Sequence, residues 1–136
     1  MICPSCKQPR LRPWRGTASI CGIAVEGRGF HCDACGEIVR ALAELERQYE
    51  VAADAIAARG IESGRELTLV RKIAELRAID VAALLDVTPE TVSRWEHDER
   101  PIPRLVAFTI GELYLHPKIT RAKLEALAKP RPKPKR

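Results

Sequence analysis

Four cysteines, arranged as two Cys-x-x-Cys pairs, constrain the fold of this chain more than any other feature of its sequence. Cys3 and Cys6 form the first pair, Cys32 and Cys35 form the second, and 25 residues separate the pairs. Each short loop can turn two thiolates toward one point, so two loops supply the four soft ligands of a tetrahedral Zn²⁺ site. We therefore expect one structural zinc ion per chain, held by these four cysteines.

Two other uses of paired cysteines fit this sequence less well. A redox motif of the thioredoxin type needs one pair on a βαβ unit, and here two pairs occur without that pattern. A catalytic zinc ion keeps an open coordination position, whereas four thiolates close the shell. A chain shorter than ~40 residues usually needs a metal or a disulfide to fold. Residues 1–36 are below that length. Metal binding should therefore drive the folding of this segment.

The remainder of residues 1–36 is expected to form a small, β-containing domain that resembles a zinc ribbon. Residues 23–30 are interpreted as two short strands around a turn at Gly27–Gly29. Gly36, which follows the second cysteine pair, is expected to let the chain turn back sharply beside the metal.

Two further residues of this segment have chemically active side chains. His31 is surplus to a full set of four thiolates, so we interpret it as a strand residue. Cys21 is the unpaired fifth cysteine, and it lies in an alternating stretch over residues 19–25. We expect Cys21 to be a small buried hydrophobic residue, and a reactive thiol is the alternative.

A helix is predicted over residues 37–60, which contain no proline and no glycine before Gly60. Gly60 is placed to end it. The apolar positions follow a heptad-like spacing and comprise Ile38, Leu42, Leu45, Tyr49, Ala52 and Ile56. This stripe could pack on the chain's own domain or form a short coiled-coil seam, and the hinge between the two halves is expected at residues 60–64.

The composition favours a mainly α fold for the rest of the chain. Aromatic residues make up only 4% of the sequence, so Ala, Leu, Ile and Val must fill the core, and this favours helices over a sandwich or barrel. No stretch approaches the ~20 consecutive apolar residues of a membrane span, and the N-terminus lacks the apolar run of a signal peptide. We expect a cytoplasmic protein that has no membrane partner.

Residues 61–128 are predicted to form a helical domain that contains two crossing helices. The second of these opens at Thr88, a good N-cap, with Pro89 in the first helical turn. On this helix Val92 and Trp95 share one face, and three polar side chains point away from them: Glu90, Thr91 and Arg94.

At this point the sequence resembles a known family. The segment from Ala82 to Glu96, AALLDVTPETVSRWE, is similar to the helix-turn-helix of the Xre/Cro class. Together with the four cysteines and the Phe30–Glu37 segment, FHCDACGE, it makes residues 1–116 similar to the MqsA-type antitoxins, which have a YgiT-type zinc finger. One departure is Asp86, which stands where the turn usually has glycine.

The resemblance implies both partners and roles for residues. Members of the family bind a ribonuclease toxin through the zinc domain, and dimerise and repress their own operon through a C-terminal helix-turn-helix domain of the five-helix type. It implies that Arg94 reads bases of double-stranded operator DNA and that Glu90 occupies a second base-reading position, with Thr88 and Thr91 beside them. The alternative is that Glu90 and Arg94, four residues apart, simply pair on an exposed face.

The charge distribution bears on DNA binding. The net charge of +5 equals the five bases of residues 129–136, which we expect to be a disordered basic tail that follows phosphates or only aids solubility. Residues 61–115 hold ten acids and seven bases, a net charge of −3. A DNA-binding domain of that sign must segregate its charges. The candidate phosphate contacts are Arg65, Arg71, Lys72 and Arg77.

The sequence therefore predicts a zinc-binding, homodimeric DNA-binding repressor that serves as the antitoxin of a type II toxin–antitoxin pair. Its domains are expected at residues 1–36, 37–60, 61–128 and 129–136, the second being the connecting helix and hinge. It is not expected to be an enzyme, since no catalytic set or phosphate loop occurs. Two alternatives are a stand-alone transcription regulator and a thiol or zinc sensor in which Cys21 exchanges into the four-thiolate site.

Overall fold

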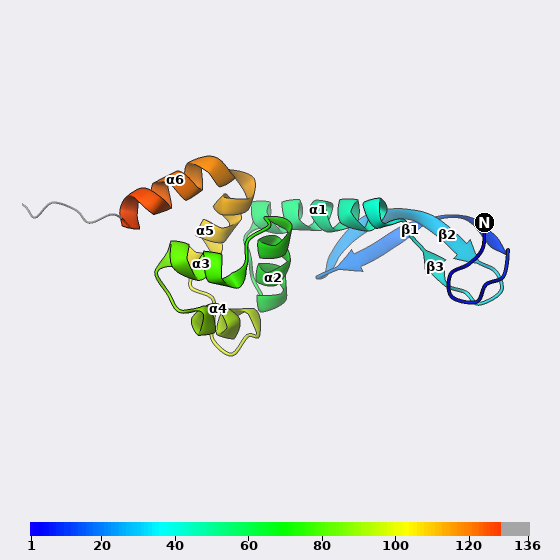
Figure 1. Ribbon diagram of the computed structural model, residues 1–136, viewed down its shortest axis with the longest axis horizontal. Helices are drawn as coiled ribbons and strands as arrows, with labels where there is room; N and C mark the ends of the chain where they lie inside the picture. Colours follow the sequence, from blue (N-terminus) through cyan, green and yellow to red (C-terminus); the bar gives the residue numbers. More distant parts are fainter. Residues whose placement is uncertain (129–136) are drawn as a thin grey trace, which may run out of the picture. The chain divides into compact units, whose positions relative to one another are not determined.

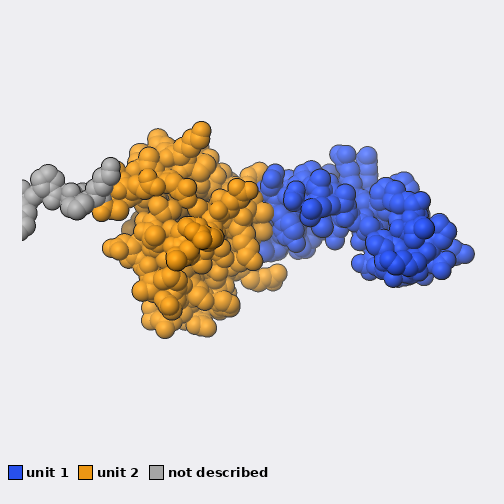
Figure 2. Space-filling view, viewed as in Figure 1, with its two compact units in different colours: residues 1–52 blue, residues 53–136 orange. Residues whose placement is uncertain are grey.

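The structure is a computed structural model that describes residues 1–128. The chain divides into two compact units, residues 1–52 and residues 53–136 (Figure 2). The basic tail predicted at residues 129–136 lies outside the described residues. Within the described part, every helix is too short or too polar to cross a lipid bilayer.

The first unit is built on a three-stranded antiparallel sheet with the order β1-β2-β3 (Figure 1). The strands are β1 (Leu11–Ile20), β2 (Ile23–Cys32) and the two-residue β3 (Ile38–Val39). Ile20 pairs with Ile23, so β1 and β2 are joined by the two-residue turn Cys21-Gly22. Both turn residues have positive φ, 49° and 79°, as a type I′ hairpin turn requires.

The prediction of a turn at Gly27–Gly29 is wrong, because both glycines lie inside β2. A β-carbon on Gly27 would lie 2.6 Å from the amide nitrogen of Gln48, and one on Gly29 would lie 2.4 Å from the carbonyl oxygen of Val39. Glycine inside a strand often marks such a close approach. These glycines let α1 and β3 approach β2 instead of reversing the chain.

Helix α1 (Leu42–Arg59) begins in the first unit and ends in the second. Its predicted start was too early, because Ile38 lies in β3. The predicted stripe is only partly buried: Ala52 and Ile56 are fully buried, but Leu42 is 71% and Tyr49 is 42% exposed. Gln48, one turn before Ala52, is fully buried. The buried face of α1 therefore begins with a polar side chain.

The physical reason for this polar face is the edge of β2. Strand β3 pairs only with Phe30 and His31, so the edge of β2 before them needs other hydrogen-bond partners. Glu44 of α1 accepts a hydrogen bond from the backbone N–H of Arg28 at 2.9 Å, and Arg47 donates to the carbonyl of Glu26 at 2.7 Å. Side chains of α1 thus replace the missing strand.

Five helices after α1 make up most of the second unit: α2 (Gly64–Ile73), α3 (Ala78–Leu85), α4 (Pro89–Glu96), α5 (Arg104–Leu115) and α6 (Pro117–Ala128). Of these, α3 and α4 correspond to the two crossing helices that the sequence predicts. The largest fully buried apolar side chains of this unit are Ile56, Leu67, Val70, Val81, Val92, Ile110 and Leu113. Burying a side chain of this size contributes about 1.5–3 kcal/mol to the free energy of unfolding.

The described chain is mainly α, with a small β sheet at its N-terminus.

A largely buried ion pair joins α2 to α4. The guanidinium of Arg71 donates to both carboxylate oxygens of Glu96, at 2.5 and 3.3 Å, and to the carbonyl of Leu76 at 2.9 Å. The two charged side chains are only 11% and 10% exposed. Where these helices meet, a β-carbon on Gly64 would lie 2.2 Å from the carbonyl oxygen of Glu96. The absence of a side chain at residue 64 is what allows this close approach.

Candidate functional site

The structure brings the four predicted metal ligands together. The sulfur atoms of Cys3, Cys6, Cys32 and Cys35 all lie within 4.8 Å of one another. The sulfurs of Cys3 and Cys35 are 3.8 Å apart, and those of Cys6 and Cys32 are 3.6 Å apart. Four Zn–S bonds of about 2.3 Å in a tetrahedron place the sulfurs about 3.8 Å apart, whereas a disulfide needs about 2.05 Å. The cluster therefore fits a metal ion of the zinc type.

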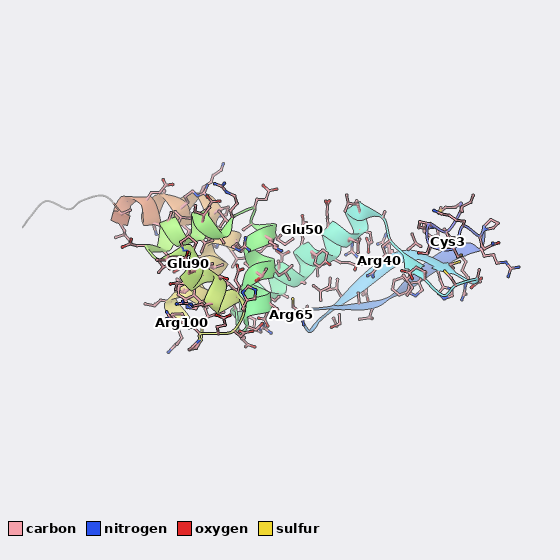
Figure 3. The ribbon with its side chains drawn as sticks, turned by 60° about the horizontal axis from the view of Figure 1, so that its bottom comes forward. Cys3, Arg40, Glu50, Arg65, Glu90 and Arg100 are labelled. Atoms are coloured by element: carbon pink, nitrogen blue, oxygen red, sulfur yellow. The ribbon has the colours of Figure 1, made fainter. Side chains whose placement is uncertain are left out.

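Two backbone loops of matching geometry present these sulfurs. The N–H of Lys7 donates to the carbonyl of Cys3 at 2.9 Å, and the N–H of Gly36 donates in the same way to Cys32 at 2.8 Å. In both loops the residue after the second cysteine has positive φ, 64° at Lys7 and 79° at Gly36. The loops converge at one end of the sheet, where Figure 3 labels Cys3. The sharp turn predicted at Gly36 is confirmed, and Lys7 occupies the equivalent turn.

This match allows a test of backbone strain. Gly36→Ala is expected to lower the free energy of unfolding by about 1 kcal/mol, because the left-handed region costs an L residue roughly 1–2 kcal/mol. A β-carbon at residue 36 meets no atom within 4 Å, so the cost is conformational. Lys7→Gly should raise the same quantity by up to about 1 kcal/mol. Urea unfolding of metal-loaded protein measures both changes.

The control for Lys7→Gly is Ser5→Gly, in the same loop at a position without positive φ. Since glycine increases the entropy of the unfolded chain, Ser5→Gly should lower stability. A gain at residue 5, or a loss at residue 7, would contradict the assignment of strain to Lys7.

The thiols differ in how readily they ionise. The backbone N–H of Cys6 lowers the pKa of Cys3 to about 7. For Cys35, the N–H of Glu37 lowers the pKa, but burial and the three neighbouring thiols outweigh it and raise the pKa to about 12. Charges held this close oppose one another, so Cys3 and Cys35 do not both ionise near neutral pH without a cation. A divalent metal ion supplies that compensating charge.

His31 lies in β2, as predicted, and contacts a residue between the ligands. Its Nδ1 is 3.1 Å from a carboxylate oxygen of Asp33, and Arg12 donates to the same oxygen at 2.7 Å. Burial raises the pKa of Asp33, but these hydrogen bonds outweigh it and hold the pKa below its ordinary value. Asp33 thus stays ionised and ties β1 to the second cysteine loop.

Cys21 lies at the opposite end of the hairpin from the metal ligands. It occupies the β1–β2 turn and is half-buried, whereas a buried strand position was expected. Nine residues of β2 separate this turn from Cys32 at the far end of the strand, a span of about 30 Å at ~3.3 Å per residue. Exchange of Cys21 into its own chain's cluster is therefore not available in this fold.

The predicted helix pair is present as α3 and α4. Asp86 ends α3 with φ 54° and ψ 48°, the left-handed conformation that glycine usually supplies in such a turn. The side-chain oxygen of Thr88 caps α4 by accepting from the N–H of Thr91 at 3.2 Å, and Pro89 is the first residue of the helix. The predicted N-cap is confirmed.

The side chains of α4 divide between two faces. Val92 and Trp95 are buried, and Glu90 and Arg94 are exposed; Figure 3 labels Glu90 on this helix. No ion pair joins Glu90 to Arg94 in the described part of the chain. Both side chains are therefore available to a ligand. Thr91 is half-buried, and its hydroxyl lies 2.9 Å from that of Thr88.

Arg71 and Arg77, which are candidate phosphate contacts, are engaged within the protein. Arg71 is held by Glu96, and Arg77 pairs with Asp80 at the start of α3 at 3.1 Å. The pairing of Arg71 with Glu96 was missed at the sequence level. One signal was available: Arg71 follows Leu67 by four residues, and so falls on the apolar side of α2.

The chain matches no protein-family model and no curated protein sequence.

Proposed function

We propose that the protein is a zinc-binding helix-turn-helix repressor that serves as the antitoxin of a type II toxin–antitoxin pair. In this proposal the four cysteines hold one structural Zn²⁺ per chain, and the zinc-binding unit engages a ribonuclease toxin. Helix α4 reads operator DNA, and the C-terminal helices form a homodimer. The toxin and operator assignments rest on the resemblance to MqsA-type antitoxins.

One observation supports DNA binding above the others. Helix α4 follows a left-handed turn at Asp86 and is anchored by Val92, Trp95 and the buried carboxylate of Glu96. Its outward side chains are then held rigidly on a helix, and an α-helix fits the major groove of B-DNA. Arg94 has the two donors that guanine O6 and N7 accept, and Glu90 can accept from cytosine N4.

Exposed apolar side chains on α5 support the proposed homodimer. Leu105 is 80% exposed and Phe108 is 66% exposed, and they lie three residues apart on the same side of the helix. Contiguous exposed apolar side chains often mark an interaction surface. A two-fold dimer is also what a helix-turn-helix protein needs to read a two-fold operator.

Arg94→Ala is the variant that tests the reading helix. It should reduce discrimination between the operator and a scrambled duplex by about 1–3 kcal/mol, since one bidentate base contact is lost. The operator is first selected from a random DNA library with the unaltered protein, and affinities are then measured by fluorescence anisotropy.

The matched control is Arg100→Ala, an exposed arginine beyond the end of α4. If Arg100 contacts only phosphate, its loss should weaken both duplexes equally. Unchanged discrimination in Arg94→Ala would refute the assignment of α4 as the reading helix.

The antitoxin half of the proposal has a separate test. The chain is purified from its native host and its bound partner is identified. A bound ribonuclease encoded beside this gene supports the antitoxin assignment. Recovery of the chain without such a partner, and without a toxin gene next to its own, favours a stand-alone transcription regulator.

A further inference from the structure

The outer face of the β1–β2 hairpin carries a hollow lined by arginines. Its volume is about 390 Å³, and Arg15, Arg28 and Arg47 contribute to its wall. The other lining residues are Thr17, Glu26 and two glycines. The whole hollow belongs to the first unit.

Two of these arginines are set directly against each other. Arg15 and Arg28 are paired across the two strands, so their side chains leave the same face of the sheet. Both are exposed, and neither has an ion-pair partner among residues 1–128. Like charges directly opposite one another destabilise a sheet. A bound anion would attract both guanidinium groups and so offset their repulsion.

The third arginine is fixed in place beside them. Arg47 donates to the carboxylate of Glu44 at 2.7 Å and to the carbonyl of Glu26, which lies two residues before Arg28 on the same strand. Glu26 also carries the only acidic side chain that lines the hollow, against three guanidinium groups. The balance of the lining is therefore positive, with Arg15 and Arg28 as the two unengaged cations.

The chemistry of the lining discriminates between classes of anionic partner. The hollow has no apolar side chain in its wall. Protein–protein interfaces have an apolar centre, whereas nucleic-acid interfaces are more polar and strongly positive. Guanidinium groups also match phosphate oxygens with two parallel hydrogen bonds. These features favour phosphate over the carboxylates of an acidic protein.

We propose that this hollow binds the phosphodiester backbone of a nucleic acid through Arg15 and Arg28, without reading its bases. The site lies on the zinc-binding unit and is separate from α4, so it does not depend on the proposed operator reading. It would give the protein a second nucleic-acid contact with a purely electrostatic character.

The test uses the full-length, metal-loaded chain and the double variant Arg15→Gln/Arg28→Gln. Three probes are titrated over a range of salt concentrations. Two are nucleic acids of equal length, a mixed-sequence DNA duplex and a single-stranded RNA, and the third is poly-glutamate. Losing two phosphate contacts should lower the slope of log affinity against log salt by about 1.8 for the duplex or about 1.4 for the single strand. Affinity at low salt should fall roughly tenfold.

The control is Lys7→Gln/Arg10→Gln, which removes the same charge from two exposed side chains of the same unit outside the hollow. This control variant should leave the salt slope unchanged. The variant Arg15→Lys/Arg28→Lys, which keeps both charges, should retain most of the slope of the unaltered protein. Metal content and melting temperature show whether each variant is folded. If the double glutamine variant does not fold, the single variants Arg15→Gln and Arg28→Gln should each lower the slope by about half as much.

Each outcome decides the question. A reduced slope with one nucleic-acid probe supports the proposal and identifies DNA or RNA as the source of the phosphates. Unchanged slopes with both nucleic-acid probes overturn it, as does a loss confined to binding of poly-glutamate, which would mark a surface for acidic proteins. Operator discrimination should survive in the Arg15/Arg28 variant, whereas Arg94→Ala should lose discrimination and keep the slope, so the two proposals fail separately.

Discussion

Replacing Cys32 with serine is expected to abolish metal binding and to unfold the sheet of the first unit. Cys32 is fully buried, ends β2 and carries one of the four clustered sulfurs. A structural zinc ion contributes an apparent ~10–16 kcal/mol at neutral pH, which is as large as the whole stability of a typical domain, about 5–15 kcal/mol. Losing one thiolate should therefore remove most of what holds this unit together.

Cys21→Ser is the matched control, because Cys21 lies in the hairpin turn outside the cluster. It should keep about one metal ion per chain, as a four-thiolate site demands. Elemental analysis measures the metal, and amide NMR spectra report whether β1 and β2 remain folded. A Cys32→Ser protein that retains a full metal complement, or a metal-free protein with an intact sheet, would overturn the structural role of the metal.

Glu96→Ala is expected to destabilise the second unit by about 3–5 kcal/mol, because removing one partner of a buried pair leaves the other charge uncompensated. That charge is the guanidinium of Arg71, which is only 11% exposed. The same change removes an anchor of α4, so DNA binding should weaken together with stability. Urea unfolding followed by the helical circular dichroism signal measures the loss.

Two further variants test whether the loss of stability comes from breaking this ion pair or from removing any acidic side chain. Glu99 is an exposed acid three residues beyond Glu96, and its replacement by alanine should change stability by no more than about 0.5 kcal/mol. The double variant Arg71→Met/Glu96→Met should recover part of the loss, because apolar side chains of similar volume can replace a buried pair. Equal losses at Glu96 and Glu99 would contradict the role given to this pair.

Features with a local cause were predictable from the sequence. The cysteine spacing predicted the pairing of sulfurs within each loop, because each loop closes on itself through one backbone hydrogen bond. The start of α4 followed from Thr88 and Pro89, whose capping and φ preferences act within one helical turn. The left-handed conformation of Asp86, which stands where the turn usually has glycine, is also a property of one residue and its neighbours.

Features set by contacts distant in sequence were not predictable in the same way. Periodicity counts apolar residues, and it therefore missed Gln48, which is buried between Arg40 and Glu44 and hydrogen-bonded to both. The sequence predicts a turn at Gly27, because nothing near it in sequence indicates that Gln48 approaches it. The partner of Arg71 is 25 residues away, so only the folded chain reveals that this base is not free for phosphate.

The hairpin also constrains how the length of this protein can vary. Both of its open ends are tied to the cysteine loops, while its far end is a two-residue turn. A residue added to one strand alone would shift every cross-strand pair between the insertion and the metal or force a bulge. Insertions and deletions within β1 and β2 should therefore be tolerated mainly in even numbers, one residue from each strand, next to the turn. In a library of length variants of this hairpin, proteins with an even number of added or removed residues should fold and bind metal more often than those with an odd number.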